Sequence, residues 1–150
     1  MKSLFDPRLA AEMIDRVQHL HADNQRVWGT MSAAQALAHC SVSMEAALGD
    51  TLPPRMFAGR IFGRLIKRLA LRNDEPIRRN SPTAPEYVIR DERNLDEERQ
   101  RLVGLIDRFV AAGPAGCTKH PHSFFGPLTP HEWAALLYKH LDHHLRQFSA

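Results

Sequence analysis

Apolar residues recur at helical spacing in four long stretches of this chain. The first stretch has its apolar residues at Leu9, Met13 and Val17. This spacing predicts a helix over about residues 6–23. The second stretch predicts a helix that is capped by Ser32 and ends at about Leu48, because Gly49 follows as a natural stop. Its many alanine and serine residues allow neighbouring helices to approach closely and leave room for a site.

The other two stretches lie in the second half of the chain. The third predicts a helix over about residues 95–112, after which a glycine and a proline stop it. The fourth predicts a helix that begins after Thr129 and extends to about Phe148, since Thr129 and Glu132 have the spacing of a capping box. Its apolar residues form one stripe at Trp133, Leu136, Leu137, Leu141, Leu145 and Phe148.

Residues 50–94 form a basic insertion between the second and third of these helices. Within it, residues 56–71 predict a basic amphipathic helix. The apolar row of this helix consists of Phe57, Ile61, Leu65 and Leu69. A loop is predicted over Asn80–Pro85, and a short extended piece over Tyr87–Ile89.

These elements predict an all-α protein with a single domain over residues 1–150. Four long helices without a sheet pattern favour a four-helix bundle. The connection between the second and third helices is much longer than an antiparallel hairpin needs. We therefore expect a long crossover that lets those two helices run parallel.

Composition and charge add limits to this interpretation. A formal net charge of +3 is mild, so nucleic-acid binding is not expected. The two cysteines, Cys40 and Cys117, form no metal or redox motif, and we expect both to be reduced. The sequence has neither a secretory signal nor a membrane-spanning apolar run, so we expect a cytoplasmic location.

The main chemical signal is a pair of histidines, His140 and His144, in the fourth predicted helix. Residues four apart lie on the same helix face, and this pair lies along the edge of the apolar stripe. Two interpretations are open. The pair holds a divalent metal together with a third ligand, or the two rings simply pack and form hydrogen bonds.

His39 is the candidate third ligand, in the middle of the second predicted helix. Its alanine-rich surroundings are hard to reconcile with a solvated side chain. The alternative is a core histidine that bonds to a backbone carbonyl or a carboxylate. Cys40 and Ser43 are nearby in sequence, but neither has an activating arrangement, and both are expected to be small core residues.

The remaining six histidines are not expected to bind metal. His143 faces away from the pair and is placed at the surface or beside the ligands. His131 is expected to be solvated. The others lie in a loop, at His120 and His122, or at the periphery of the first helix, at His19 and His21.

The segment Arg55–Arg79 holds eight basic residues against two acidic ones. We interpret it as the solvated basic face of an ordinary amphipathic helix. The alternatives are an anion-binding lid over the metal site, a membrane-surface helix, and a contact with nucleic-acid phosphates.

Two strings of residues resemble the DinB-like superfamily. Trp28–His39 is similar to its second-helix entry, in which a tryptophan and a serine-capped helix lead to a single histidine. Lys139–Gln147 is similar to its last-helix motif, His-x-x-x-His-x-x-Gln. The run from His122 to Trp133 looks closer to a functionally uncharacterised branch of that superfamily.

This resemblance implies a DinB-like four-helix bundle in which His39, His140 and His144 hold a divalent metal. Zinc or nickel is favoured, with iron or manganese as alternatives. Gln147 matches the motif glutamine and lies one turn beyond His144, where it can orient a ligand. The resemblance also implies a homodimer.

For activity, the resemblance implies a metal-dependent thiol transferase or hydrolase. Three protein ligands leave a coordination position open for a small-molecule substrate, such as a low-molecular-weight thiol. The competing hypothesis is a non-enzymatic metal- or ligand-binding module that acts in stress response or partner contact. A third is that the histidines are structural and the bundle is a dimerisation unit.

Overall fold

The computed structural model describes residues 1–81 and 87–150. Across these residues the chain is all-helical, with five α-helices, one short 3-10 helix after α4 and no β-strand. The helices are α1 (Pro7–Gln18), α2 (Ala33–Leu48), α3 (Phe57–Ala70), α4 (Leu95–Ala112), η2 (Pro114–Gly116) and α5 (Pro130–Arg146). No helix in the described ranges has both the length and the apolar content to cross a membrane.

Most helix ends follow from local capping chemistry. Ser32 and Thr129 each form a complete capping box, with Gln35 and Glu132 respectively, at the starts of α2 and α5. Gly49 ends α2 in the left-handed conformation, with a φ of 82°. These ends confirm the predicted ones.

The first helix is shorter than predicted. It ends at Gln18 rather than near residue 23. The backbone N–H of Leu20 bonds to the carbonyl of Val17, and the N–H of His21 bonds to the side chain of Asn24. These local turns compete with helix propagation, which apolar spacing alone does not reveal.

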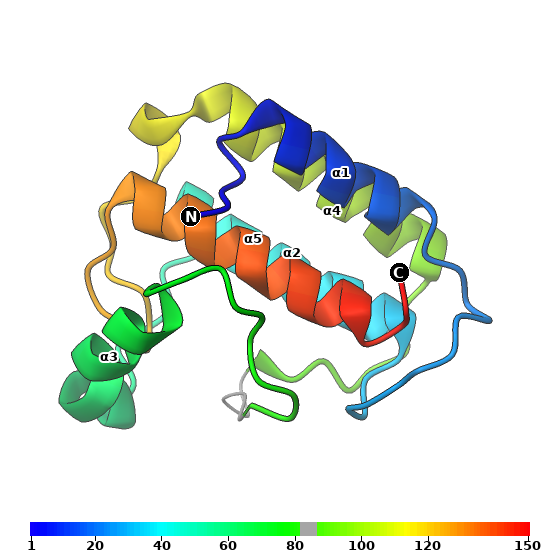
Figure 1. Ribbon diagram of the computed structural model, residues 1–150, viewed down its shortest axis with the longest axis horizontal. Helices are drawn as coiled ribbons and strands as arrows, with labels where there is room; N and C mark the ends of the chain where they lie inside the picture. The colour runs from blue at the N-terminus through cyan, green and yellow to red at the C-terminus, as the bar shows by residue number, and fades with distance from the viewer. Residues whose placement is uncertain (82–86) are drawn as a thin grey trace.

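Four of the helices share one hydrophobic core. Around this core, α1 packs on α4, α4 on α2, α2 on α5, and α5 on α1. In Figure 1, α2 and α4 run in the same direction and α1 and α5 run in the opposite one. The largest fully buried side chains include Trp133, Phe109, Met13, Met44 and Leu141. The predicted parallel arrangement of α2 and α4 is therefore present.

The connection between α2 and α4 departs from the predicted local structure. Residues 87–90 form no strand where a short extended piece was expected. The predicted loop over residues 80–85 falls mostly outside the described residues. Residues 76–79 lie in irregular chain that passes close to α5, since the carbonyl of Ile77 contacts His143.

Helix α3 lies to one side of the four packed helices (Figure 1). Its buried residues are two glycines, Gly59 and Gly63, and its apolar row is exposed. An ordinary amphipathic helix would bury that row. Here the glycine edge contacts the protein instead, because a Cβ at either glycine would overlap the backbone of Phe124.

Candidate metal centre

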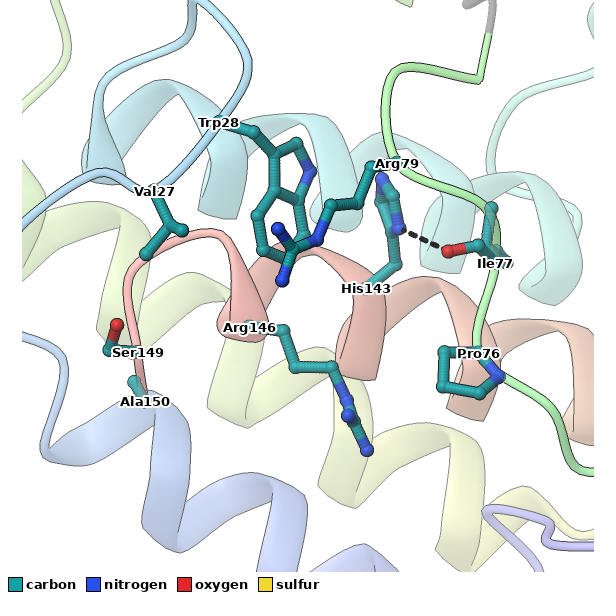
Figure 2. A pocket seen from close by; sticks show the side chains of 9 residues that line it. All are labelled: Val27, Trp28, Pro76, Ile77, Arg79, His143, Arg146, Ser149 and Ala150. Atoms are coloured by element: carbon teal, nitrogen blue, oxygen red, sulfur yellow. Dashed lines mark hydrogen bonds between the residues drawn. The ribbon is translucent and has the colours of Figure 1, made fainter.

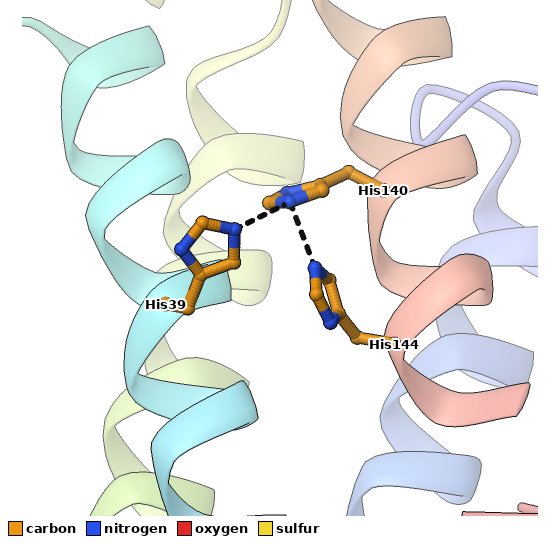
Figure 3. A group of neighbouring side chains, drawn as sticks. All are labelled: His39, His140 and His144. Carbon is orange, nitrogen blue, oxygen red and sulfur yellow. Dashed lines mark hydrogen bonds between the residues drawn. The ribbon is translucent and has the colours of Figure 1, made fainter. Parts of the chain in front are cut away.

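Three histidines from two helices meet between α2 and α5. His39 projects from the middle of α2, and His140 and His144 project from successive turns of α5 (Figure 3). Their ligand atoms all lie within 4.8 Å of one another. His39 and His144 are buried and His140 is partly buried. The fold therefore brings together the three side chains that the sequence proposed as ligands.

The ring nitrogens of the three histidines are in direct contact. The Nε2 atom of His140 lies 2.9 Å from Nε2 of His39 and 3.1 Å from Nε2 of His144. A tetrahedral zinc ion with Zn–N bonds of about 2.05 Å would hold two ligand nitrogens about 3.3 Å apart. Two of the three pairs thus already have nearly the spacing of ligands on one ion, and all three ligand atoms lie within 4.8 Å of one another.

Hydrogen bonds at Nδ1 set the tautomers of two of the rings, His39 and His144. Nδ1 of His39 lies 2.7 Å from the carbonyl oxygen of Tyr87, and Nδ1 of His144 lies 2.6 Å from Oε1 of Gln147. Because a carbonyl oxygen only accepts, each Nδ1 carries the proton and donates it. Each Nε2 then presents a lone pair toward His140.

Burial keeps the three rings neutral. It lowers the pKa of His144 to about 3, with a further contribution from the nearby His39. Burial also lowers the pKa of His39 and takes the pKa of His140 well below its ordinary value. Neutral imidazole is the form that binds metal, so the trio is in its ligand form at neutral pH.

His143 lies beside the trio without belonging to it. Its side chain is buried, and Nδ1 is 3.2 Å from the carbonyl oxygen of Ile77. Its ring centroid is 5.1 Å from that of His144 and 5.8 Å from that of Trp28. This position beside the ligands is one of the two that the sequence predicted.

His122 also lies outside the metal cluster, in the loop before α5. Its Nδ1 accepts the backbone N–H groups of Phe124 and Phe125, at 3.1 and 3.2 Å. Burial lowers the pKa of His122 to about 4, and the positive charge of Arg55 adds to the shift. The ring therefore organises the loop on which α3 is seated.

Three of the remaining candidates lie where they were expected, whereas Ser43 is partly buried rather than a core residue. His131 is exposed, and His19 is exposed beside Asp15. Burial raises the pKa of the Cys40 thiol, so Cys40 is a core residue rather than a nucleophile.

Three contacts of the site were not predicted from the sequence. They are the carbonyls of Tyr87 and Ile77, which fix His39 and His143, and the glycine at position 29. A carbonyl is present in every residue, so its use depends only on where the chain passes. A turn glycine, by contrast, is a signal, and Gly29 has a φ of +80°.

A cleft of about 400 Å³ adjoins His143 (Figure 2). Arg79 reaches across it, with its guanidinium carbon 4.4 Å from the centroid of the Trp28 ring. Arg146 lines the same cleft and pairs with Asp142 at 2.7 Å. In the described part of the chain no carboxylate pairs with Arg79, so its charge is available to an anionic group.

The fold and the site define an all-helical protein with a cluster of three histidines, two of them buried and one partly buried. Residues 4–150 match the family described as "Protein of unknown function (DUF1569)", and the chain belongs to that family. Neither a curated protein nor a solved structure gives a significant match to this sequence.

Proposed function

We propose that this protein binds one divalent metal ion through His39, His140 and His144, in a four-helix bundle of DinB-like type. The observation that carries the proposal is that Nε2 of His140 contacts Nε2 of His39 and Nε2 of His144, two rings whose tautomers are set by acceptors outside the cluster. Imidazole ligands suit zinc or nickel, with iron or manganese as alternatives.

The same contacts argue against a purely structural role for the histidines. His39 and His144 both present an Nε2 lone pair to the Nε2 of His140. One N–H on that nitrogen can serve one neighbour only, which leaves the buried lone pair of the other neighbour without a donor. A cation at the centre would satisfy the lone pairs of all three nitrogens.

The chemistry would follow from an incomplete ligand set. A bound metal would supply a Lewis acid with at least one coordination position that the protein leaves open. Gln147 and the carbonyl of Tyr87 hold two of the imidazoles in the ligating orientation. No carboxylate of the described residues joins the three histidines within ligand distance.

For the reaction, we propose a thiol-dependent transfer or hydrolysis. Glutathione and bacillithiol carry carboxylates as well as a thiol, and Arg79 in the cleft beside His143 is available to bind a carboxylate. The alternative is a non-enzymatic metal- or ligand-binding module that acts in stress response or partner contact. Cytoplasmic location and homodimer formation stay predictions.

Metal analysis of untagged protein tests the site. Wild-type protein should hold one ion per chain, and the variant with His39, His140 and His144 all changed to Gln should hold none. His143→Gln is the matched control, because it alters a buried histidine beside His144 that is not a proposed ligand. Equal metal in the wild type and the triple variant would refute the assignment.

Turnover separates the two candidate functions. Metal-loaded protein is incubated with an electrophilic substrate and glutathione, mycothiol or bacillithiol, with metal-stripped protein as the control. An enzyme should show turnover that depends on the metal, and Arg79→Gln should raise the KM for glutathione. Metal binding without turnover across the panel would favour the binding module.

A further inference from the structure

Helix α3 turns a continuous apolar face to solvent. Its exposed large apolar residues are Phe57, Ile61, Phe62, Leu65, Ile66 and Leu69. Phe57 is 78% exposed and Leu65 is 60% exposed. Elsewhere in the described ranges, exposed large apolar side chains are scattered singly, as at Met1 and Val27. A contiguous patch of this kind marks an interaction site.

The apolar face of α3 is exposed because of how the helix is attached to the rest of the protein. Cβ atoms at Gly59 and Gly63 would overlap the backbone of Phe124, so this edge of the helix lies flat on the loop before α5. Near the other end, Lys67 pairs with Glu132 at 3.0 Å, and Lys139 donates to the carbonyl of Ala70 at 2.6 Å. The helix is thus held along one narrow edge, with its apolar face outward.

The charges on α3 have one sign. Arg60, Arg64 and Arg68 are exposed, and each follows a residue of the apolar row by three positions. Residues three apart are neighbours on a helix surface, so the arginines border the apolar face. Residues 55–72 include no Asp or Glu. No carboxylate in the described part of the chain pairs with these three arginines.

We propose that α3 is an interfacial helix that docks this protein on an anionic lipid bilayer. Its apolar face would enter the boundary between headgroups and acyl chains, and its arginines would bind lipid phosphates. The helix has 14 residues, about 21 Å at 1.5 Å per residue, which is too short to span a bilayer. It would therefore lie in the plane of the surface.

The same observations disfavour a second copy of the chain as the occupant. Two copies that paired through this face would bring their arginine rows together without an acidic residue between them. Such like-charge contact is costly. Helix α3 lies to one side of the four packed helices (Figure 1), and its outward apolar face suits a flat bilayer. The proposal does not depend on the metal or on the proposed activity.

Vesicle sedimentation with the full chain tests the proposal. The protein should sediment with vesicles of phosphatidylcholine and phosphatidylglycerol, more weakly with phosphatidylcholine alone, and less as salt is raised. Each basic residue near an anionic surface contributes about a fivefold factor, so Arg64→Gln/Arg68→Gln should reduce partitioning roughly thirtyfold. Among the residues that the structure describes, neither arginine forms a side-chain hydrogen bond or an ion pair, and both are exposed.

The matched control is Arg8→Gln/Lys119→Gln, which removes the same charge from exposed positions outside α3. This control variant should partition onto vesicles nearly as the wild type does. An equal loss of partitioning in the two double variants would overturn the proposal. Leu65→Trp should show a blue-shifted emission on the anionic vesicles.

Three further outcomes would also overturn membrane docking. One is no sedimentation with anionic vesicles at low salt. Another is a dimer in solution that Leu65→Ser dissociates, which would assign the face to a second copy. The third is a blue shift of the Leu65→Trp emission with soluble polyglutamate but not with vesicles. That result would assign the apolar face of α3 to an acidic protein partner.

Discussion

The Nδ1 atom of His144 lies 2.6 Å from the side-chain oxygen of Gln147, one turn further along the chain. This hydrogen bond turns the other ring nitrogen of His144 toward His140. Gln147 is itself buried, so its amide is held in place by the surrounding protein. The geometry of the proposed metal site therefore depends on a residue that is not a ligand.

Gln147→Leu should weaken metal binding. The change removes the acceptor for His144 Nδ1. Loss of such a hydrogen bond to a ligating histidine lowers the affinity for metal by roughly 10–100-fold. Gln147→Glu keeps an acceptor oxygen and should stay near wild-type affinity. Competition with a chelator of known affinity measures both. Equal weakening in the two variants would show that the hydrogen bond is not responsible.

Gly29→Ala should also disturb the hydrogen bond between His144 and Gln147. Gly29 has a φ of +80°, and a Cβ there would overlap the Nε2 atom of Gln147. We expect a loss of about 1 kcal/mol or more in unfolding free energy, together with weaker metal binding. Gly104→Ala is the control, because a Cβ at Gly104 meets nothing within 4 Å and the residue lies inside α4. Denaturant unfolding should show that control to be neutral or stabilising.

His122 should make the metal-free protein sensitive to acid. Its pKa is lowered to about 4 in the folded state, whereas an unfolded histidine titrates near 6.5. Below about pH 6.5 the unfolded state binds a proton that the folded state takes up only near pH 4. The free energy of unfolding therefore falls as the pH is lowered from about 6.5 to about 4. The contribution of one such histidine is at most about 3 kcal/mol.

His122→Asn isolates this contribution. An Asn oxygen can accept the N–H groups of Phe124 and Phe125 but does not titrate. Urea unfolding of both proteins in chelator, from neutral pH down to about pH 4, should give a shallower pH dependence for the variant. Parallel pH dependences would mean that His122 is not the group responsible.

Gly63→Ala should detach α3 from its seat. A Cβ at this position would overlap the carbonyl oxygen of Phe124, which belongs to a backbone and has little freedom to move. The basic residues of α3 should then be cleaved faster by trypsin, while the core stays intact. Ala58→Ser, a small change at an exposed position of the same helix, is the control. Unchanged proteolysis of Gly63→Ala would contradict the proposed seat.

Much of this fold was determined locally by the sequence. The capping residues Ser32 and Thr129 and the stop at Gly49 place helix ends without knowledge of the fold, because they satisfy backbone groups within one turn. The spacing of His140 and His144 likewise places both rings on one face of α5. The prediction for α1 was less accurate, since turns beyond Gln18 compete with the helix.

The tertiary structure decided what those local elements do together. Only the packing of α2 on α5 brings His39 into contact with His140, across 101 residues of chain. Only the path of the connecting chain places the carbonyl of Tyr87 on His39. The apolar row of α3 is exposed because the narrow glycine edge fits the loop at Phe124. Helical periodicity identifies a face, but which face is buried depends on the shape of the surface it meets.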